Sequence, residues 1–239
     1  MPKLYNIGDS FSYGNCVQSY ENFADDNKHL GPGDIIAEEL GYEHINLASP
    51  GLSPDGVLRR LYTTDFEEVD SFLLIGIPPE NRFQTVGQFV RDQHRDRSYY
   101  KGTDYKAKAF MYGPKMETDW FRTHSHLSGR LKAINLEETL IYNSWFNILL
   151  IQKRLRELNL KFVIYNSVYG QMQHKTKLKE LLSIKDQINY VNYFQPKHGI
   201  QDLVNTNDKF RIARDDVHPN HSCYAIWCKK LLKFIKENK

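Results

Sequence analysis

The stretch KLYNIGDSFSYG, residues 3–14, decides the fold we predict for this chain. Its first part, Lys3 to Ile7, is apolar at alternating positions and ends at Gly8, a pattern typical of a β-strand that runs into a tight turn. Ser10 follows this turn. In α/β sheets, side chains at the carboxyl ends of strands point into the crevice where ligands bind. The stretch therefore predicts a serine hydroxyl at the binding edge of a sheet.

The rest of the chain alternates between strand and helix patterns. Helices are predicted over Asp34–Leu40, from Pro54 to about Tyr62, and over Arg130–Asn159, Thr176–Leu182 and Pro219–Lys236. Strands are predicted over His44–Ala48, Ser71–Ile77, Lys161–Asn166 and Tyr190–Phe194. Because strands that alternate with helices pair in parallel, we predict a three-layer α/β/α fold around a parallel five-stranded sheet. Residues 1–239 are expected to form one domain.

Residues from about 78 to 129 interrupt this alternation and are predicted to be an insertion. They are rich in aromatic and basic side chains: Arg95, Arg97, Tyr99, Tyr100, Lys101, Tyr105, Lys106, Lys108, Phe110 and Tyr112. Such a segment could cap a sugar-binding site or stack nucleic-acid bases, and it could equally be a solvated structural loop. Acidic Asp92, Asp96 and Asp104 dilute its positive charge. All three interpretations stay open.

Composition excludes several classes of protein. Hydrophobic residues make up 41% of the chain and charged residues 26%, which excludes disordered and collagen-like chains. Lys and Arg outnumber Asp and Glu by only 32 to 29, so nucleic acid is an unlikely partner. No apolar run approaches the roughly 18 residues of a membrane-spanning helix, and the first ten residues lack the core of a secretory signal. We therefore expect a cytoplasmic protein without a membrane partner.

Cysteines and histidines give no strong metal pattern. The three cysteines are Cys16, Cys223 and Cys228. They form neither a CxxC pair nor a zinc framework, and we expect buried, reduced thiols, with a nucleophilic Cys16 as the alternative. His124 and His126 would share one face of a strand and could bind a metal with His94. No acidic pair lies near them at ligand spacing, so we predict no metal and no cofactor.

The sequence DDVH, residues 215–218, supplies the groups that a serine nucleophile needs. A hydroxyl is a weak nucleophile unless a base accepts its proton, and His218 is the obvious base for Ser10. Asp215, three residues earlier, could orient the imidazole from a turn, with Asp216 as a less suitable substitute. These residues also have structural explanations. Ser10 and Asp9 could simply end a strand in a turn, and the DDVH segment could begin a helix with its histidine in solvent.

Both motifs resemble those of the SGNH, or GDSL-like, hydrolases, whose first block is GDSxxxG and whose last is DxxHP. They match residues 8–14 and 215–219. The resemblance covers the framework of the chain and leaves the insertion out. It implies a flavodoxin-like three-layer fold, a catalytic triad of Ser10, Asp215 and His218, and a closing helix that begins at Pro219. It implies no cofactor.

Two further blocks of the family bear on the oxyanion hole. By the same resemblance, Gly51 supplies a backbone N–H that joins the N–H of the nucleophile in this hole. The third block of the family is GxND, whose Asn adds a donor, but here the run is GIPP, residues 76–79. Pro78, in the place of this Asn, cannot donate a hydrogen bond. Unless Asn81 or Arg82 replaces it, the loss of one donor costs about a hundredfold to a thousandfold in turnover.

Together these observations predict a serine esterase that forms an acyl-Ser10 intermediate. The polar, aromatic insertion favours a small acyl group such as acetate on a carbohydrate, so the expected partner is a small-molecule or glycan ester. Asp9 and Arg82 are the predicted substrate contacts. The first alternative is a catalytically silent SGNH-like domain that binds a glycan or a protein, and the second is a nucleic-acid-binding module built on the insertion. Oligomeric state is left open.

Overall fold

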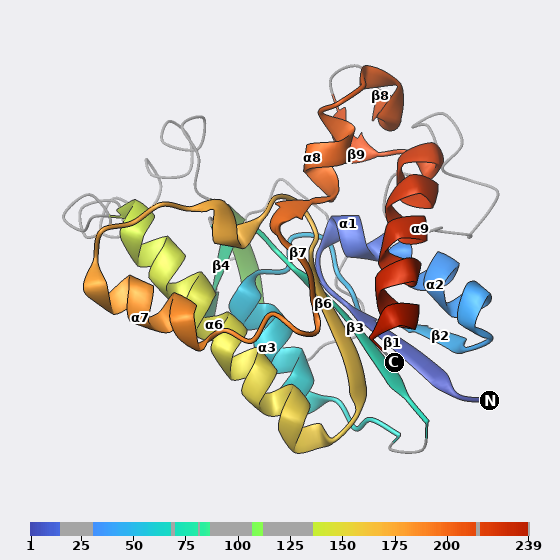
Figure 1. Ribbon diagram of the computed structural model, residues 1–239, viewed down its shortest axis with the longest axis horizontal. Coiled ribbons are helices and arrows are strands. Elements are labelled where there is room, and N and C mark those ends of the chain that lie inside the picture. The colour runs from blue at the N-terminus through green and yellow to red at the C-terminus, as the bar shows by residue number, and fades with distance from the viewer. Residues whose placement is uncertain are drawn as a thin grey trace, which may run out of the picture.

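A five-stranded parallel sheet forms the centre of the molecule (Figure 1). The computed structural model describes residues 1–14, 31–67, 70–80, 82–86, 107–111, 136–213 and 216–238. The strands of the sheet are β1 (Lys3–Ile7), β2 (Glu43–Asn46), β3 (Phe72–Ile77), β6 (Lys161–Asn166) and β7 (Tyr193–Gly199). Every neighbouring pair runs parallel. The predicted parallel sheet is confirmed.

The strand order β2-β1-β3-β6-β7 fixes where a ligand site is expected. From β1 the chain first adds β2 on one side and then β3 on the other, so the direction of winding reverses between β1 and β3. This is the flavodoxin-like order. In open α/β sheets, ligands bind outside the carboxyl ends of the strands at this switch point. Ser10 lies three residues beyond the end of β1, and the GIPP run, residues 76–79, spans the end of β3 and the two prolines after it.

Two layers of helices cover the two faces of the sheet (Figure 1). The first layer contains α3 (Pro54–Thr63), α6 (Leu136–Leu158) and α7 (Lys179–Gln187), and the second contains α2 (Pro32–Leu40), α8 (Ile200–Val204) and α9 (His221–Glu237). Alternate residues of each strand serve the two layers: in β3, Leu73 and Ile75 pack into the first, and Phe72 and Leu74 into the second. The predicted three-layer fold is thus confirmed.

Short elements at the carboxyl edge complete the described fold. They are α1 (Ser10–Tyr13), η2 (Gln171–Gln173), η3 (Asp208–Phe210), β8 (Arg211–Ala213) and β9 (Asp216–Pro219). The predicted insertion contains β4 (Arg82–Val86) and β5 (Ala107–Met111), which pair antiparallel. An antiparallel pair needs no helical crossover, so two strands can pair within the insertion. The other residues of the insertion from 81 onward, up to residue 129, lie outside the described parts.

Several boundaries differ from the predicted ones for local reasons. Pro32 begins α2 two residues early, because proline suits the first position of a helix. The α7 helix is shifted toward the carboxyl terminus, since Leu181 and Ile184 are the residues that it buries. The closing helix begins after Pro219, because Asn220 caps it by accepting a hydrogen bond from the Cys223 N–H at 3.1 Å. For α6, the predicted start at residue 130 lies outside the described residues.

The strand β7 also begins later and ends later than predicted. Its pairing with β6 is irregular between Tyr165 and Asn166. The Asn166 side chain donates to the backbone carbonyls of Pro196 and His198, at 3.1 and 3.0 Å, and accepts a hydrogen bond from the Tyr193 hydroxyl at 2.6 Å. A buried asparagine therefore holds a segment whose proline and glycine argue against a strand.

The described residues include no helix long and apolar enough to cross a bilayer. Cys223 and Cys228 are buried free thiols, and burial raises the pKa of Cys223 to about 12 and that of Cys228 further. No group of three metal-ligating side chains occurs in the described part of the chain. Cys16 and the three histidines considered as metal ligands, His94, His124 and His126, lie outside it.

Candidate active site

Ser10 begins a one-turn helix at the carboxyl edge of the sheet. The strand β1 ends at Ile7, and α1 follows two residues later. Asp9 caps α1, since one of its carboxylate oxygens accepts a hydrogen bond from the Phe11 N–H at 3.1 Å. Ser10 is therefore the first residue of a helical turn. We call residues 8–14 the serine turn.

Hydrogen bonds close the serine turn and tie it to two strands. Gly14 adopts a left-handed conformation, φ 79°, and its N–H donates to the Ser10 carbonyl. Asn6 of β1 and Asn46 of β2 donate to the carbonyls of the last two residues of α1, at 2.7 and 3.2 Å. These carbonyls have no partner within so short a helix. Sequence reasoning missed both asparagines, whose one signal is a polar side chain inside each strand.

His218 is brought to Ser10 by the antiparallel pair of β8 and β9. Its Nε2 lies 3.2 Å from the Ser10 Oγ, although 208 residues separate the two along the chain. The imidazole also packs on the Phe11 ring, with centroids 4.9 Å apart and planes tilted by 32°. Behind it, the Asn220 side chain donates to the Arg211 carbonyl at 3.2 Å. The predicted meeting of these two distant segments is present.

The acidic member of the predicted triad lies outside the described residues. Asp215 therefore stays a prediction. Asp216, the alternative carboxylate, is the first residue of β9 and pairs with Ala213 of β8. The segment expected to be a turn or the start of a helix is a strand, because β8 supplies an antiparallel partner.

Gly51 lies in a tight turn beside the serine turn. Ser49 donates its N–H to the Gly8 carbonyl at 2.8 Å, and the Leu52 N–H closes a turn onto the Ser49 carbonyl at 3.1 Å. Gly51 has φ 78° and follows a proline, which are the features of a type II turn. The hydrogen bond that closes this turn runs from Leu52 to Ser49 and does not use the Gly51 N–H. The role of Gly51 as an oxyanion donor remains a prediction.

Residues 76–80, which we call the third-block loop, comprise the last two residues of β3 and the three residues after it, and two of their carbonyls are already engaged. The Ile77 carbonyl accepts hydrogen bonds from the Ser167 N–H and hydroxyl, at 3.0 and 2.9 Å. The Pro78 carbonyl accepts one from the Gln171 side chain at 3.2 Å. Both donors come from the segment after β6. The loop is therefore fixed in place without offering a donor at Pro78.

A charged group at the end of the third-block loop was not predicted. The Glu80 carboxylate lies 3.1 Å from the His174 Nε2 and accepts a hydrogen bond from the Tyr169 hydroxyl at 3.4 Å. The side chains of Glu80 and His174 are only 12% and 19% exposed. The group joins the ends of β3 and β6. No sequence spacing reveals it, because its members are up to 94 residues apart and match no motif.

The other predicted site residues stand as follows. The Asp9 side chain is fully buried and is engaged as the cap of α1. Asn81 lies outside the described residues, and Arg82 is placed as the first residue of β4. Their roles as substrate contacts or as a replacement donor remain predictions.

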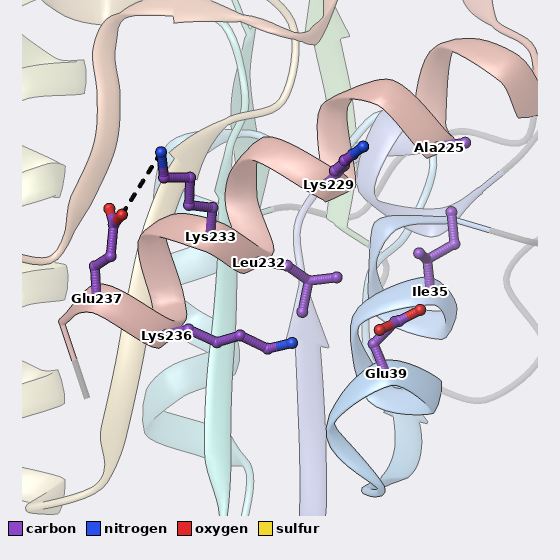
Figure 2. A pocket seen from close by; sticks show the side chains of 8 residues that line it. All are labelled: Ile35, Glu39, Ala225, Lys229, Leu232, Lys233, Lys236 and Glu237. Carbon is purple, nitrogen blue, oxygen red and sulfur yellow. Dashed lines mark ion pairs between the residues drawn. The ribbon is translucent and has the colours of Figure 1, made fainter.

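A groove between α2 and α9 lies apart from these residues. Figure 2 shows its lining: Ile35, Glu39, Ala225, Lys229, Leu232, Lys233, Lys236 and Glu237. Lys233 and Glu237 form an ion pair with a distance of 3.7 Å across one turn of α9 (Figure 2). The lining combines apolar side chains with charged ones of both signs. The lining includes neither Ser10 nor His218, so this groove is not the site assembled around the serine turn.

Comparisons with known proteins give only remote likenesses. No family model and no curated protein matches the chain. A lipase from a goat rumen metagenome is 12% identical with a TM-score of 0.48, and the match covers 98% of this chain and 97% of that one. An acetylxylan esterase from Geobacillus stearothermophilus is 14% identical with a TM-score of 0.46, over 98% and 94% of the chains. A putative GDSL-like lipase from Parabacteroides merdae is 11% identical with a TM-score of 0.45, over 99% and 94%.

Proposed function

We propose that this chain is a serine ester hydrolase of SGNH type, with Ser10 as nucleophile and His218 as base. The observation that carries the proposal is the 3.2 Å separation of the Ser10 Oγ and the His218 Nε2 at the switch point of the sheet. This distance allows direct proton transfer.

The reaction follows from the two groups. As the Ser10 Oγ attacks the ester carbonyl carbon, its proton passes to the His218 Nε2. The carbonyl electron pair moves onto oxygen, and the N–H groups of Ser10 and Gly51 are the proposed donors to this oxyanion. Collapse of the intermediate breaks the ester bond, and the imidazolium protonates the departing alcohol. Water, activated by the same imidazole, then releases the acid from Ser10.

A small acyl group on a carbohydrate is the proposed substrate. Ser10 is only 6% exposed, and its partner His218 packs on the Phe11 ring, which favours acetyl over long acyl chains. The polar and aromatic composition of residues 78–129 favours a sugar over a lipid as the alcohol. Asp215 is the proposed orienting carboxylate for His218, and no cofactor takes part in this scheme.

A second candidate, a silent domain that binds a glycan or a protein, is favoured by one observation. The third-block loop offers engaged carbonyls and a proline where an extra oxyanion donor is expected. At about a hundredfold to a thousandfold for one missing donor, the loss is compatible with either a slow enzyme or a retired site.

A fluorophosphonate probe distinguishes the two candidates, because it labels only an activated serine. We expect labelling of the wild-type chain at Ser10, mapped by peptide mass, and none in Ser10→Ala or His218→Ala. Ser183→Ala, an exposed serine on α7, is the matched control and should label normally. An unlabelled but folded wild-type chain would reject the esterase. If labelling occurs, p-nitrophenyl esters of increasing acyl length and then acetylated sugars identify the substrate.

A further inference from the structure

The hydroxyl of Ser12, a residue of the serine turn, lies in a buried and closely packed space. Ser12 is fully buried, and its Oγ accepts a hydrogen bond from the hydroxyl of Tyr165 at 2.9 Å. Tyr165 lies on β6, 153 residues away along the chain, and is itself fully buried. The bond links the serine turn to β6, an interior strand of the sheet.

Two glycines provide the space for this hydroxyl. A Cβ on Gly8 or on Gly76 would fall within 3.0 Å of the Ser12 Oγ, closer than real Cβ contacts occur. At Gly76, the same Cβ would also lie 2.9 Å from the Tyr165 hydroxyl oxygen. Space around Ser12 thus gives both positions a reason to be glycine. Gly76, the first residue of the GIPP run, is therefore explained by its packing against the serine turn rather than by a role in binding the oxyanion.

The serine turn needs such a contact because α1 cannot hold its shape alone. A single helical turn fixes several backbone angles for one or two hydrogen bonds, so short helices are unstable without tertiary contacts. The Tyr224 hydroxyl of α9 donates to the Phe11 carbonyl at 2.9 Å and provides one of them. The contact from Tyr165 is a second one, and it reaches a side chain two residues from the nucleophile.

The Tyr165 hydroxyl is a constant donor. Burial raises the pKa of this phenol far above the range in which proteins work, so it keeps its proton. A buried hydroxyl that loses its partner is costly, so the Tyr165 hydroxyl and the Ser12 Oγ hold each other in place. The rotation of α1 about its axis, and with it the direction of the Ser10 side chain, is coupled to this bond.

We propose that Ser12 and Tyr165 are positioning residues that keep the Ser10 Oγ within reach of the His218 Nε2. The inference rests on the proposed esterase function. Neither side chain touches the reacting atoms. Their contribution is to the fraction of molecules in which nucleophile and base are aligned, so their loss lowers kcat and leaves KM nearly unchanged.

Tyr165→Phe tests this, because it removes one hydroxyl and nothing else. Tyr193→Phe is the matched control: Tyr193 is also fully buried, and its hydroxyl bonds to Asn166 on the neighbouring strand rather than to the serine turn. We expect Tyr165→Phe to reduce kcat and the rate of fluorophosphonate labelling about tenfold, the effect of one buried hydrogen bond, with KM within about twofold. Tyr193→Phe should lower Tm comparably with kcat unchanged.

A second variant and a second readout keep the test decisive. Ser12→Ala should reduce kcat about as much, and the double variant should lose no more than either single one, because one bond is removed in each case. Equal kcat in Tyr165→Phe and Tyr193→Phe, or additive losses in the double variant, would overturn the proposal. If the wild-type chain is not labelled at all, the function fails separately. In that case, hydrogen exchange of the backbone amides of Tyr13 and Gly14 remains as a readout. Exchange rates that Tyr165→Phe leaves unaltered would refute the claim that the hydrogen bond between Tyr165 and Ser12 holds the serine turn.

Discussion

The serine turn and the third-block loop lie at the ends of neighbouring strands of one sheet, but they differ in the polar groups that they present. The serine turn carries a hydroxyl, the start of a helix and a nearby imidazole, and four side chains from other elements hold it. They are Asn6, Asn46, Tyr165 and Tyr224. The third-block loop carries two prolines, and the carbonyls of Ile77 and Pro78 are engaged by the segment after β6.

From this difference we expect a chain that has the nucleophile and the base of an esterase but has one hydrogen-bond donor fewer to stabilise the oxyanion. Gly76 leaves the space that the Ser12 hydroxyl needs, whereas Pro78 stands where the resembled motif has a donor. We expect a working but slow esterase.

The largest effect is expected from removing the attacking groups. Ser10→Ala and His218→Ala should each reduce kcat/KM for p-nitrophenyl acetate by about a thousandfold or more, because members of such a unit fail together. His221→Ala, an exposed histidine at the start of α9, is the control. A His218→Ala variant that turns over like His221→Ala would break the comparison on the side of the serine turn.

Restoring a donor to the third-block loop should raise turnover. Pro78→Asn places an amide where the family has one, and we expect kcat to rise by up to about a hundredfold. Pro79→Asn, one residue further, should not raise it. The measurement is kcat with a single small ester at saturating concentration. A folded Pro78→Asn variant without any gain would show that the proline is not what limits the rate.

Filling the space of the Ser12 hydroxyl should destabilise the fold. Gly76→Ala should lower the free energy of unfolding by about 2 kcal/mol, the usual cost of overpacking a core. Gly41→Ala, at a left-handed position with φ 70° and no neighbour within 4 Å of the added Cβ, should cost only about 1 kcal/mol. Urea unfolding measures both. Equal losses would mean that Gly76 is not packed against Ser12.

The smallest effect is expected at the charged end of the third-block loop. Glu80→Gln keeps the shape of the side chain but removes its charge beside His174, and should lower the free energy of unfolding by about 1 kcal/mol. Glu237→Gln removes the partner of Lys233 in an exposed pair and should cost less than about 0.5 kcal/mol. A Glu80→Gln variant as stable as Glu237→Gln would show that the pair does not fix the loop.

Sequence reasoning succeeded where a segment depends on its own residues. The strands Lys3–Ile7 and Lys161–Asn166 have the predicted bounds, since short apolar runs beside turn residues define a buried strand. Helix α3 begins at the predicted Pro54, because proline suits the first position of a helix. The meeting of Ser10 and His218 was predicted from a different signal, the need of a serine nucleophile for a base and the resemblance of residues 8–14 and 215–219 to two family motifs.

The remaining features depend on partners that only the folded chain brings together. The extension of β7 through Pro196 depends on hydrogen bonds from Asn166, and β9 depends on the neighbouring β8. Glu80 and His174 meet because β3 and β6 are adjacent. No local pattern in the sequence carries information on such pairs.

The most direct test of the central claim is to trap the acyl group on its residue. The chain is mixed with p-nitrophenyl acetate, quenched in acid during turnover, digested and mapped by mass. We expect one acetyl group on the peptide that contains Ser10, absent when His218 is replaced by alanine. Turnover without acetyl on that peptide, or acetyl on the same peptide in the His218→Ala variant at the wild-type rate, would contradict it.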